Sequence, residues 1–213
     1  MPTYAFPSGL VVDDLRQTLP RHASKVYARR TLRQVKGLCV HNSGPPAHKD
    51  HASAFLADYH VNDNDWPAIA YNFVVHWDGA IDYTLDWQEC GWHAGGQNNI
   101  DYLAICLTGW WDGRTPSEAQ LTATRELVAA LQHAFGTWFP VVGHKQIYAS
   151  ACPGDTWEQW RERVTVKPPE ATPAPDLAAR VAALEATLGE RDAEIARQRA
   201  KLQQIAALAG SSA

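Results

Sequence analysis

Three side chains of the kind that bind metal ions, far apart along the sequence, constrain this chain more than any other feature. His41 ends an apolar run, while His144 and Cys152 lie much later in a stretch rich in Gly, Pro and small residues. Two imidazoles and one thiolate suit Zn²⁺, and three protein ligands leave a fourth position for water, as in catalytic zinc sites. If these side chains converge, the chain is a metal-dependent hydrolase.

Other residues compete for the same role, and the residue pattern alone does not exclude them. His60, His76 and His93 could also be ligands. Taken alone, a strand histidine such as His41 is more often held by ordinary hydrogen bonds than bound to a metal. Cys39 and Cys106 lie in apolar runs typical of core strands. Cys90 lies beside a Gly-rich loop, where we expect partial exposure. None of the four cysteines forms a C-x-x-C pair, which argues against a closed zinc knuckle.

Composition limits the function classes that are open to the chain. It has 213 residues, of which 46% are hydrophobic, and a formal net charge of −4. This suits one globular domain with an appendage and offers no strongly basic surface for nucleic acid. No apolar run is long enough to span a membrane. The first residues lack the pattern of a signal peptide, so we expect synthesis in the cytoplasm with reduced thiols.

Apolar runs alternate with helix-like segments, which indicates an α/β or α+β sheet domain with helices packed against it. In the first run, the period of two places Cys39 and His41 on one face and Leu38 and Val40 on the other. Strands are expected at 37–40, 71–77, 80–85, 102–107 and 139–142. Helices are expected at 10–19, 49–59, 115–136 and from 155 to 164, with T-x-x-E and D-x-x-E capping boxes opening the last two.

The C-terminal part changes character. Four prolines in residues 167–176 predict a semi-rigid linker after a domain at 35–166, with residues 1–34 as an N-terminal arm packed on it. Residues 177–209 follow a heptad pattern, with Arg191 and Gln198 as polar layers. This predicts a coiled-coil helix that makes the chain a homo-oligomer; the alternative is an amphipathic helix docking on its own domain. The apolar seam consists of Leu177, Val181, Leu184, Leu188, Ile195, Leu202, Ile205 and Ala209.

Four segments in order resemble a known family. CVHNSG, WPAIAYNFVVHWDG, GWHAGGQNNIDYLAICLTG and GHKQIYASACPGD are similar to the successive motifs of the zinc-dependent N-acetylmuramoyl-L-alanine amidases, which include short phage lysins and animal peptidoglycan recognition proteins. The resemblance covers roughly residues 35–165. It implies a mixed central sheet flanked by helices, with zinc at one edge of a groove.

The resemblance also implies roles for individual residues. His41, His144 and Cys152 match the family's zinc ligands, and Tyr71 matches a tyrosine near the metal-bound water that is implicated in catalysis. His93 resembles a position that contacts the sugar–peptide substrate. Independently of the family, Trp66, Trp92, Trp110 and Trp111 lie in loop-like sequence, where exposed rings could stack on a sugar, although ordinary packing is equally expected.

Two positions depart from the family pattern. Many members carry Lys two residues before the last ligand, where this chain has Ser150, a hydroxyl that could donate to a developing oxyanion. Some bacterial members carry Glu where this chain has Cys106, so no carboxylate is evident as a strong general base. Since charge-assisted hydrogen bonds are roughly twice as strong as neutral ones, we expect an active but slower enzyme.

The expected function is therefore hydrolysis of the amide between N-acetylmuramic acid and L-alanine in bacterial peptidoglycan, by a phage or prophage endolysin that reaches the wall after release. Three alternatives stay open. One is a module that binds peptidoglycan without cutting it, another is a cytoplasmic amidase that recycles wall fragments, and the third is a structural or tethering protein built around the coiled coil. Retention of Cys152 and Tyr71 favours the enzyme.

Overall fold

The computed structural model describes residues 1–45, 49–167 and 186–199. The chain divides into two compact units, Met1–Lys167 and Pro168–Ala213. Most of the expected linker and the outer parts of the expected coiled coil lie outside the described residues.

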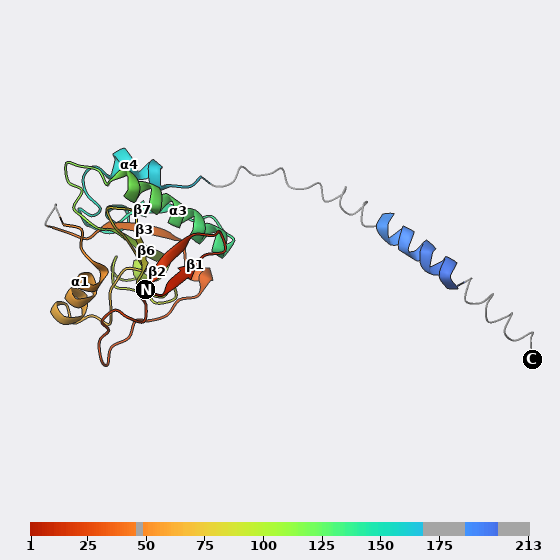
Figure 1. Ribbon diagram of the computed structural model, residues 1–213, viewed down its shortest axis with the longest axis horizontal. Helices are drawn as coiled ribbons and strands as arrows, with labels where there is room; N and C mark the ends of the chain where they lie inside the picture. Colours follow the sequence, from red (N-terminus) through yellow and green to blue (C-terminus); the bar gives the residue numbers. More distant parts are fainter. Residues whose placement is uncertain (46–48, 168–185, 200–213) are drawn as a thin grey trace, which may run out of the picture. The chain divides into compact units, whose positions relative to one another are not determined.

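The first unit alternates short strands with helices along the chain (Figure 1). The strands are β1 Thr3–Ala5, β2 Val11–Asp14, β3 Gly37–Asn42, β4 Phe73–Val75, β5 Ile81–Tyr83, β6 Tyr102–Leu107 and β7 Val141–Gly143. The α-helices are α1 Ser53–Asp58, α2 Asn98–Asp101, α3 Glu118–Phe135 and α4 Trp157–Val164. Short turns of helix, η1 Leu32–Gln34, η2 Tyr59–Asp63 and η3 His144–Gln146, complete the unit.

Within the described residues, the seven strands form one mixed sheet in the order β1-β2-β5-β4-β6-β3-β7. Strand β3 lies between β6 and β7 and is parallel to both, with Val40 opposite Gly143. Because parallel strands end at the same edge of a sheet, the residues at the carboxyl ends of β3 and β7 lie side by side. This topology brings His41 and His144 together from distant parts of the sequence.

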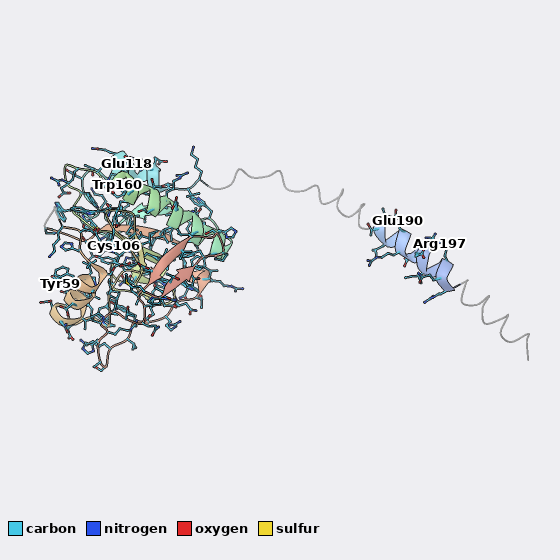
Figure 2. The ribbon with its side chains drawn as sticks, viewed as in Figure 1. Tyr59, Cys106, Glu118, Trp160, Glu190 and Arg197 are labelled. Atoms are coloured by element: carbon cyan, nitrogen blue, oxygen red, sulfur yellow. The ribbon has the colours of Figure 1, made fainter. Side chains whose placement is uncertain are left out.

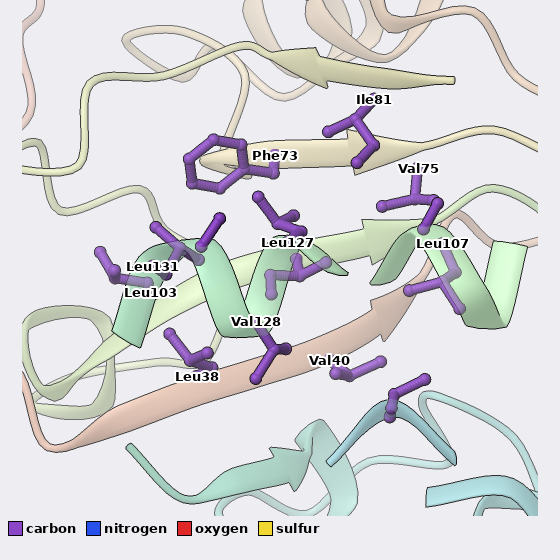
Figure 3. Packing of buried hydrophobic residues seen from close by; sticks show 14 of the residues in the cluster. Leu38, Val40, Phe73, Val75, Ile81, Leu103, Leu107, Leu127, Val128 and Leu131 are labelled. Carbon is purple, nitrogen blue, oxygen red and sulfur yellow. The ribbon is translucent and has the colours of Figure 1, made fainter. Parts of the chain in front are cut away.

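One face of the sheet is the main hydrophobic core, covered by α3 (Figure 3). Leu38 and Val40 of β3 point to this face, and Leu127, Val128 and Leu131 form the apolar stripe of α3 that meets them. Burial of each such leucine or valine contributes about 1.5–3 kcal/mol of transfer free energy. Helix α4 adds Trp157, Trp160 and Val164 to the same core, and Figure 1 shows it beside α3.

The other face of the sheet carries the polar and sulfur-containing side chains. The alternation along β3 turns Cys39 and His41 away from α3, as the period of two predicts. A second, smaller core lies on this side, where α1 packs Leu56 and Ala57 near Val74 and Cys106. The functional side chains are thus held between a rigid sheet and a separate apolar cluster.

The expected helix at residues 10–19 is wrong. Val11–Asp14 form β2, which pairs with β1 and, in parallel, with β5 through Asp13 opposite Asp82. Two β-branched residues at its start favour the strand, and the pairing with a segment far along the chain overrides local helix propensity. The first residues of the arm therefore extend the central sheet.

The capping residues of both later helices also differ from the prediction. The N-cap of helix α3 lies two residues after Thr115, because Ser117 caps it by accepting a hydrogen bond from the Gln120 N–H. Helix α4 has Thr156 at its N-cap, and the Asp155 carboxylate instead accepts from the Gly113 N–H. The predicted end of α3 is correct, since Gly136 has a left-handed conformation with φ of 62°.

In the second unit, residues 186–199 are helical and expose their side chains, among them Glu190 and Arg197 (Figure 2). Arg197 pairs with Glu194 at 2.6 Å, an i,i+3 contact along the helix surface. In the part of the chain that is described, no helix combines the length and the apolar character needed to cross a membrane.

Candidate metal centre

His41, His144 and Cys152 lie together at the carboxyl ends of β3 and β7. One potential ligand atom from each lies within 4.8 Å of the other two. His41 Nδ1 is 3.6 Å from Cys152 Sγ, and the centroids of the two imidazole rings are 4.5 Å apart. The sequence prediction that these three residues converge agrees with this geometry.

The loop after β7 holds Cys152 in place through backbone contacts. The Asn42 N–H, at the end of β3, donates to Cys152 Sγ at 3.2 Å, and the Lys145 N–H donates to the Cys152 carbonyl at 2.7 Å. The Ser150 hydroxyl accepts from the Cys152 N–H at 3.1 Å. Burial raises the pKa of the Cys152 thiol to about 12, against the lowering effect of the Asn42 N–H. Binding of a cation by this sulfur would therefore release a proton.

The environment of His144 fits a metal ion. Its Nε2 is buried and has no hydrogen-bond partner among the described residues. Burial also lowers the pKa of His144, so the ring is neutral and offers a lone pair. Tyr148 stacks on the ring, with centroids 5.6 Å apart and planes 16° apart. An unpaired buried nitrogen is costly in a protein interior, and coordination of a cation would satisfy it. Neutral imidazoles and a thiolate are donors that Zn²⁺ prefers.

Tyr71 lies just before β4, half-buried, with its ring centroid 5.4 Å from that of His41. Desolvation, followed by the neighbouring thiols of Cys106 and Cys152, raises the pKa of Tyr71 well above its usual value. The phenol therefore keeps its proton at neutral pH and can act as a hydrogen-bond donor beside the cluster.

His93 has surroundings unlike those expected of a substrate contact. It is buried, with Nδ1 2.9 Å from His41 Nε2 and Nε2 3.2 Å from the Tyr102 carbonyl oxygen. Both ring nitrogens thus face protein atoms. Cys39, His41 and His93 form a second group whose ligand atoms lie within 4.8 Å of one another, and all three are buried.

Two of the tryptophans lie on a line of aromatic rings leading away from the cluster. The Trp66 ring is 4.9 Å from His60, whose ring is 5.4 Å from Tyr71, and Trp92 follows at 6.2 Å from Trp66. Trp92 is 43% exposed, and Trp66 is partly buried. Trp111, by contrast, belongs to the main hydrophobic core, so of the two alternatives left open for these rings ordinary packing holds there.

Comparison with known proteins gives the family. A family model described as N-acetylmuramoyl-L-alanine amidase matches residues 31–155, more than half of the chain. The chain belongs to the N-acetylmuramoyl-L-alanine amidase family. The resemblance found in the sequence motifs is thereby confirmed, and the cluster lies within the matched segment.

Two curated relatives of this amidase domain are animal proteins. Peptidoglycan-recognition protein SC2 of Drosophila melanogaster is 29% identical over 112 residues, which are 48% of this chain and 60% of that protein. The human N-acetylmuramoyl-L-alanine amidase is 30% identical over 120 residues, 52% of this chain and 20% of that protein. The chain thus spans less than two thirds of either relative.

Solved structures confirm the fold of the amidase domain. The endolysin of the Thermus scotoductus bacteriophage Ph2119 matches with a TM-score of 0.61 and 23% identity, over 73% of this chain and 99% of that protein. The amidase LysC of Clostridium intestinale matches with a TM-score of 0.60 and 19% identity, over 73% and 98%. The mixed sheet flanked by helices predicted from the motifs is therefore correct.

The structure also distinguishes among His60, His76 and His93, which the residue pattern left open as competing metal ligands. His76 lies between Asp50 and Asp82, with contacts of 2.9 and 3.0 Å, and His60 accepts from the Ala70 N–H at 3.1 Å. Of the three competing histidines, only His93 joins a metal-binding group among the described residues. Neither group contains a carboxylate, in keeping with Cys106 at the position where some members carry Glu.

Sequence reasoning missed several supporting residues. It gave no role to the Asn42 amide that contacts Cys152, nor to the buried Arg30, whose guanidinium donates to the Tyr102 carbonyl. Contacts of backbone amides and carbonyls leave no trace in a residue pattern. Cys90, expected to be partly exposed, is buried.

Proposed function

We propose that this protein is a zinc-dependent hydrolase that cleaves the amide between N-acetylmuramic acid and L-alanine in bacterial peptidoglycan. The observation that carries the proposal is the convergence of His41, His144 and Cys152 around an unpaired buried nitrogen, within a domain of the amidase family. The catalytic domain would comprise residues 35–166.

The three residues would hold the ion through the two imidazoles and the thiolate. Zinc bound there supplies Lewis acidity toward an amide carbonyl and lowers the pKa of a water molecule, from about 15.7 to about 7 in favourable sites. Neither of the two metal-binding groups of the described residues contains a carboxylate. The side chains that the protein can offer to the reaction are therefore neutral hydrogen-bond donors.

Tyr71 and Ser150 are the candidates for those donors. The phenol of Tyr71 stays protonated and lies beside His41, so it can donate to the oxyanion that develops on the amide carbonyl. The Ser150 hydroxyl already accepts a hydrogen bond from the Cys152 N–H, which leaves its own proton available for donation. Loss of one such donor typically costs about 100- to 1000-fold in rate.

Trp66, Trp92 and His93 were the expected substrate contacts, and two of them keep that role in the proposal. Trp92 exposes a large part of its ring and lies near Trp66, so both can pack against the sugar–peptide strand. His93 is buried and is not among these contacts.

We propose that the protein acts on the wall as an endolysin does, and the match of its fold to almost the whole length of a phage endolysin supports this. An amidase that recycles wall fragments would instead prefer small soluble muropeptides. Rates on intact sacculi and on soluble muropeptides separate these two roles.

The C-terminal helix would join copies of the chain. Leu188 and Ile195 lie seven residues apart on residues 186–199 and are 61% and 48% exposed, so an apolar stripe is left without cover within the described unit. A second copy of the same heptad pattern would bury it. Sedimentation of the full chain beside Ile195→Glu tests this, since the charged variant should be monomeric.

The decisive experiment is digestion of purified peptidoglycan with and without a chelator. Release of new α-amino groups on L-alanine, abolished by the chelator and restored by zinc, is the expected result. New reducing sugar ends would instead indicate a glycosidase. Binding to peptidoglycan without any product would indicate a recognition module and overturn the enzymatic proposal.

A further inference from the structure

A chain of hydrogen-bonding groups extends from His41 into the protein, away from Cys152. His41 Nε2 lies 2.9 Å from His93 Nδ1, and the two rings meet edge to face at 88°. His93 Nε2 lies 3.2 Å from the carbonyl oxygen of Tyr102. The same carbonyl accepts from Nη1 of Arg30, which precedes the segment matched by the family.

The last acceptor of this chain fixes the direction of every hydrogen bond in it. A carbonyl oxygen can only accept, so His93 Nε2 must carry a proton. A neutral imidazole has one N–H, so His93 Nδ1 is then an acceptor and His41 Nε2 must donate to it. The lone pair of His41 is therefore on Nδ1, the atom that faces Cys152 Sγ at 3.6 Å.

The surroundings of His93 keep its ring neutral. His93 is buried, and the guanidinium of Arg30 lies in the same interior, held by the carbonyls of Glu89, Ile100 and Tyr102. A second buried cation beside Arg30 would have no carboxylate partner in these contacts and would be costly. The doubly protonated form, which would reverse the direction of the bond to His41, is thus disfavoured.

We propose that His93 is a positioning residue that fixes the tautomer and ring orientation of His41, so that Nδ1 is presented to the metal. The zinc part of this inference rests on the proposed function, whereas the tautomer part does not. Ligating histidines generally donate their second nitrogen to such a partner, and its loss typically lowers metal affinity about 10- to 100-fold. Here the partner is the imidazole of His93, which donates to the Tyr102 carbonyl. Arg30 of the N-terminal arm donates to the same carbonyl.

The first test needs no metal. Nitrogen-15 NMR of the imidazole rings in the metal-free protein reports which nitrogen carries the proton. We expect Nε2–H for both His41 and His93. A proton on His41 Nδ1, or a doubly protonated His93 at neutral pH, would overturn the inference. If the wild type takes up no zinc at all, the proposed function fails, and this measurement still decides the inference.

The second test measures zinc affinity by competition with a chelator. His93→Phe fills the same space without an acceptor and should bind zinc about 10- to 100-fold more weakly. His93→Asn should stay near the wild type, because its Oδ1 is as many bonds from Cα as Nδ1 is and can accept from His41. His60→Phe is the matched control, since His60 is another buried histidine but its hydrogen bond goes to the Ala70 N–H.

Each outcome of this comparison decides between two roles for His93. Weak binding by the Phe variant with rescue by Asn supports the positioning role, provided that both variants unfold cooperatively like the wild type. Equal affinity of the Phe variant and the wild type would contradict it. A second equivalent of zinc in the wild type that is lost in both variants would also contradict it, because His93 would then be a ligand with Cys39 and His41.

Discussion

The domain contains two histidine clusters whose ionisation runs in opposite directions. In the first, His41, His93 and His144 lie among thiols and other imidazoles, and burial lowers the pKa of all three. In the second, burial would likewise lower the pKa of His76, but hydrogen bonds with Asp82 and Asp50 outweigh it and raise the pKa to about 9. At pH 7 the histidines of the first cluster are therefore neutral, whereas His76 in the second cluster is protonated and carries a positive charge.

The difference shows what each cluster can do. A neutral imidazole has a lone pair for a metal ion, whereas a protonated one has none. His76 instead ties the loop that carries Asp50 to the ends of β4 and β6, because Asp50 also accepts from the Thr108 hydroxyl at 2.6 Å. Neighbouring carboxylates, more than burial itself, make the difference between the protonated His76 and the neutral His41.

The largest effect should come from removing the sulfur of the neutral cluster. Cys152→Ser is expected to weaken zinc binding by more than the roughly 10- to 100-fold that follows loss of an outer partner. Hydrolysis of peptidoglycan should fall to background. Zinc content after dialysis and release of alanine amines measure both effects. Cys90→Ser is the control, because Cys90 belongs to neither metal-binding group; zinc retention in the Cys152 variant would refute the ligand assignment.

Acid should destabilise the metal-free protein through the neutral cluster. The pKa of His93 is about 3 in the folded protein, whereas an unfolded histidine titrates near 6.5. As the pH falls below about 6.5, the histidines of the unfolded chain become protonated, whereas those of the folded cluster stay neutral. Each such histidine can then cost up to about 1.4 kcal/mol per pH unit, down to about pH 3 for His93. Urea unfolding at pH 7, 6 and 5 measures the slope.

His93→Phe removes one of these histidines and should reduce the acid slope in the same series of measurements. The comparison cancels the contribution of carboxylates elsewhere in the chain, which both proteins share. If the slopes of the variant and the wild type coincide, the neutral state of His93 does not limit acid stability.

The charged cluster should show the opposite dependence. Its contribution to stability is complete below the unfolded pKa near 6.5 and is lost as the pH rises through the folded value of about 9. Asp82→Asn should lower the pKa of His76 and cost about 1–3 kcal/mol, since a buried partner is lost. NMR titration of His76 and urea unfolding between pH 6 and 10 measure these changes. Asp78→Asn is the control, because Asp78 contacts the Ala80 N–H instead; an unchanged His76 midpoint in Asp82→Asn would contradict the assignment.

Part of the site followed from the sequence, because the faces of a strand are set locally and the order of the motifs resembles that of a known family. The alternation along β3 fixed the faces of Cys39 and His41, and the ordered motifs fixed the approximate ends of the strands that deliver His41 and His144. The end of α3 was also predictable, since Gly136 adopts a conformation that disfavours other residues.

The predictions that were wrong, such as the helix at 10–19 and the cap of α3 at Thr115, share a different physical origin. Contacts between residues far apart in the sequence determine both segments. Strand β2 exists because Asp13 lies opposite Asp82, and no residue near β2 reports that partner. Ser117, rather than Thr115, caps α3 partly because its hydroxyl also donates to the Trp77 carbonyl. The role of His93 depends on the Tyr102 carbonyl, which every residue type would supply equally.

The smallest expected effect on stability comes from Ser150, beside the neutral cluster. The Ser150 hydroxyl accepts from the Cys152 N–H, so Ser150→Ala should cost about 0.5–1.5 kcal/mol in unfolding free energy and slow hydrolysis. Ser150→Lys brings an ammonium to the same place and should raise kcat above that of the Ala variant, because charge-assisted hydrogen bonds to an oxyanion are roughly twice as strong as neutral ones. Steady-state rates with matched zinc loading measure this. If the Ala variant is as fast as the wild type and Lys gives no gain, Ser150 takes no part in catalysis. Its role would then be limited to the hydrogen bond that it accepts from the Cys152 N–H.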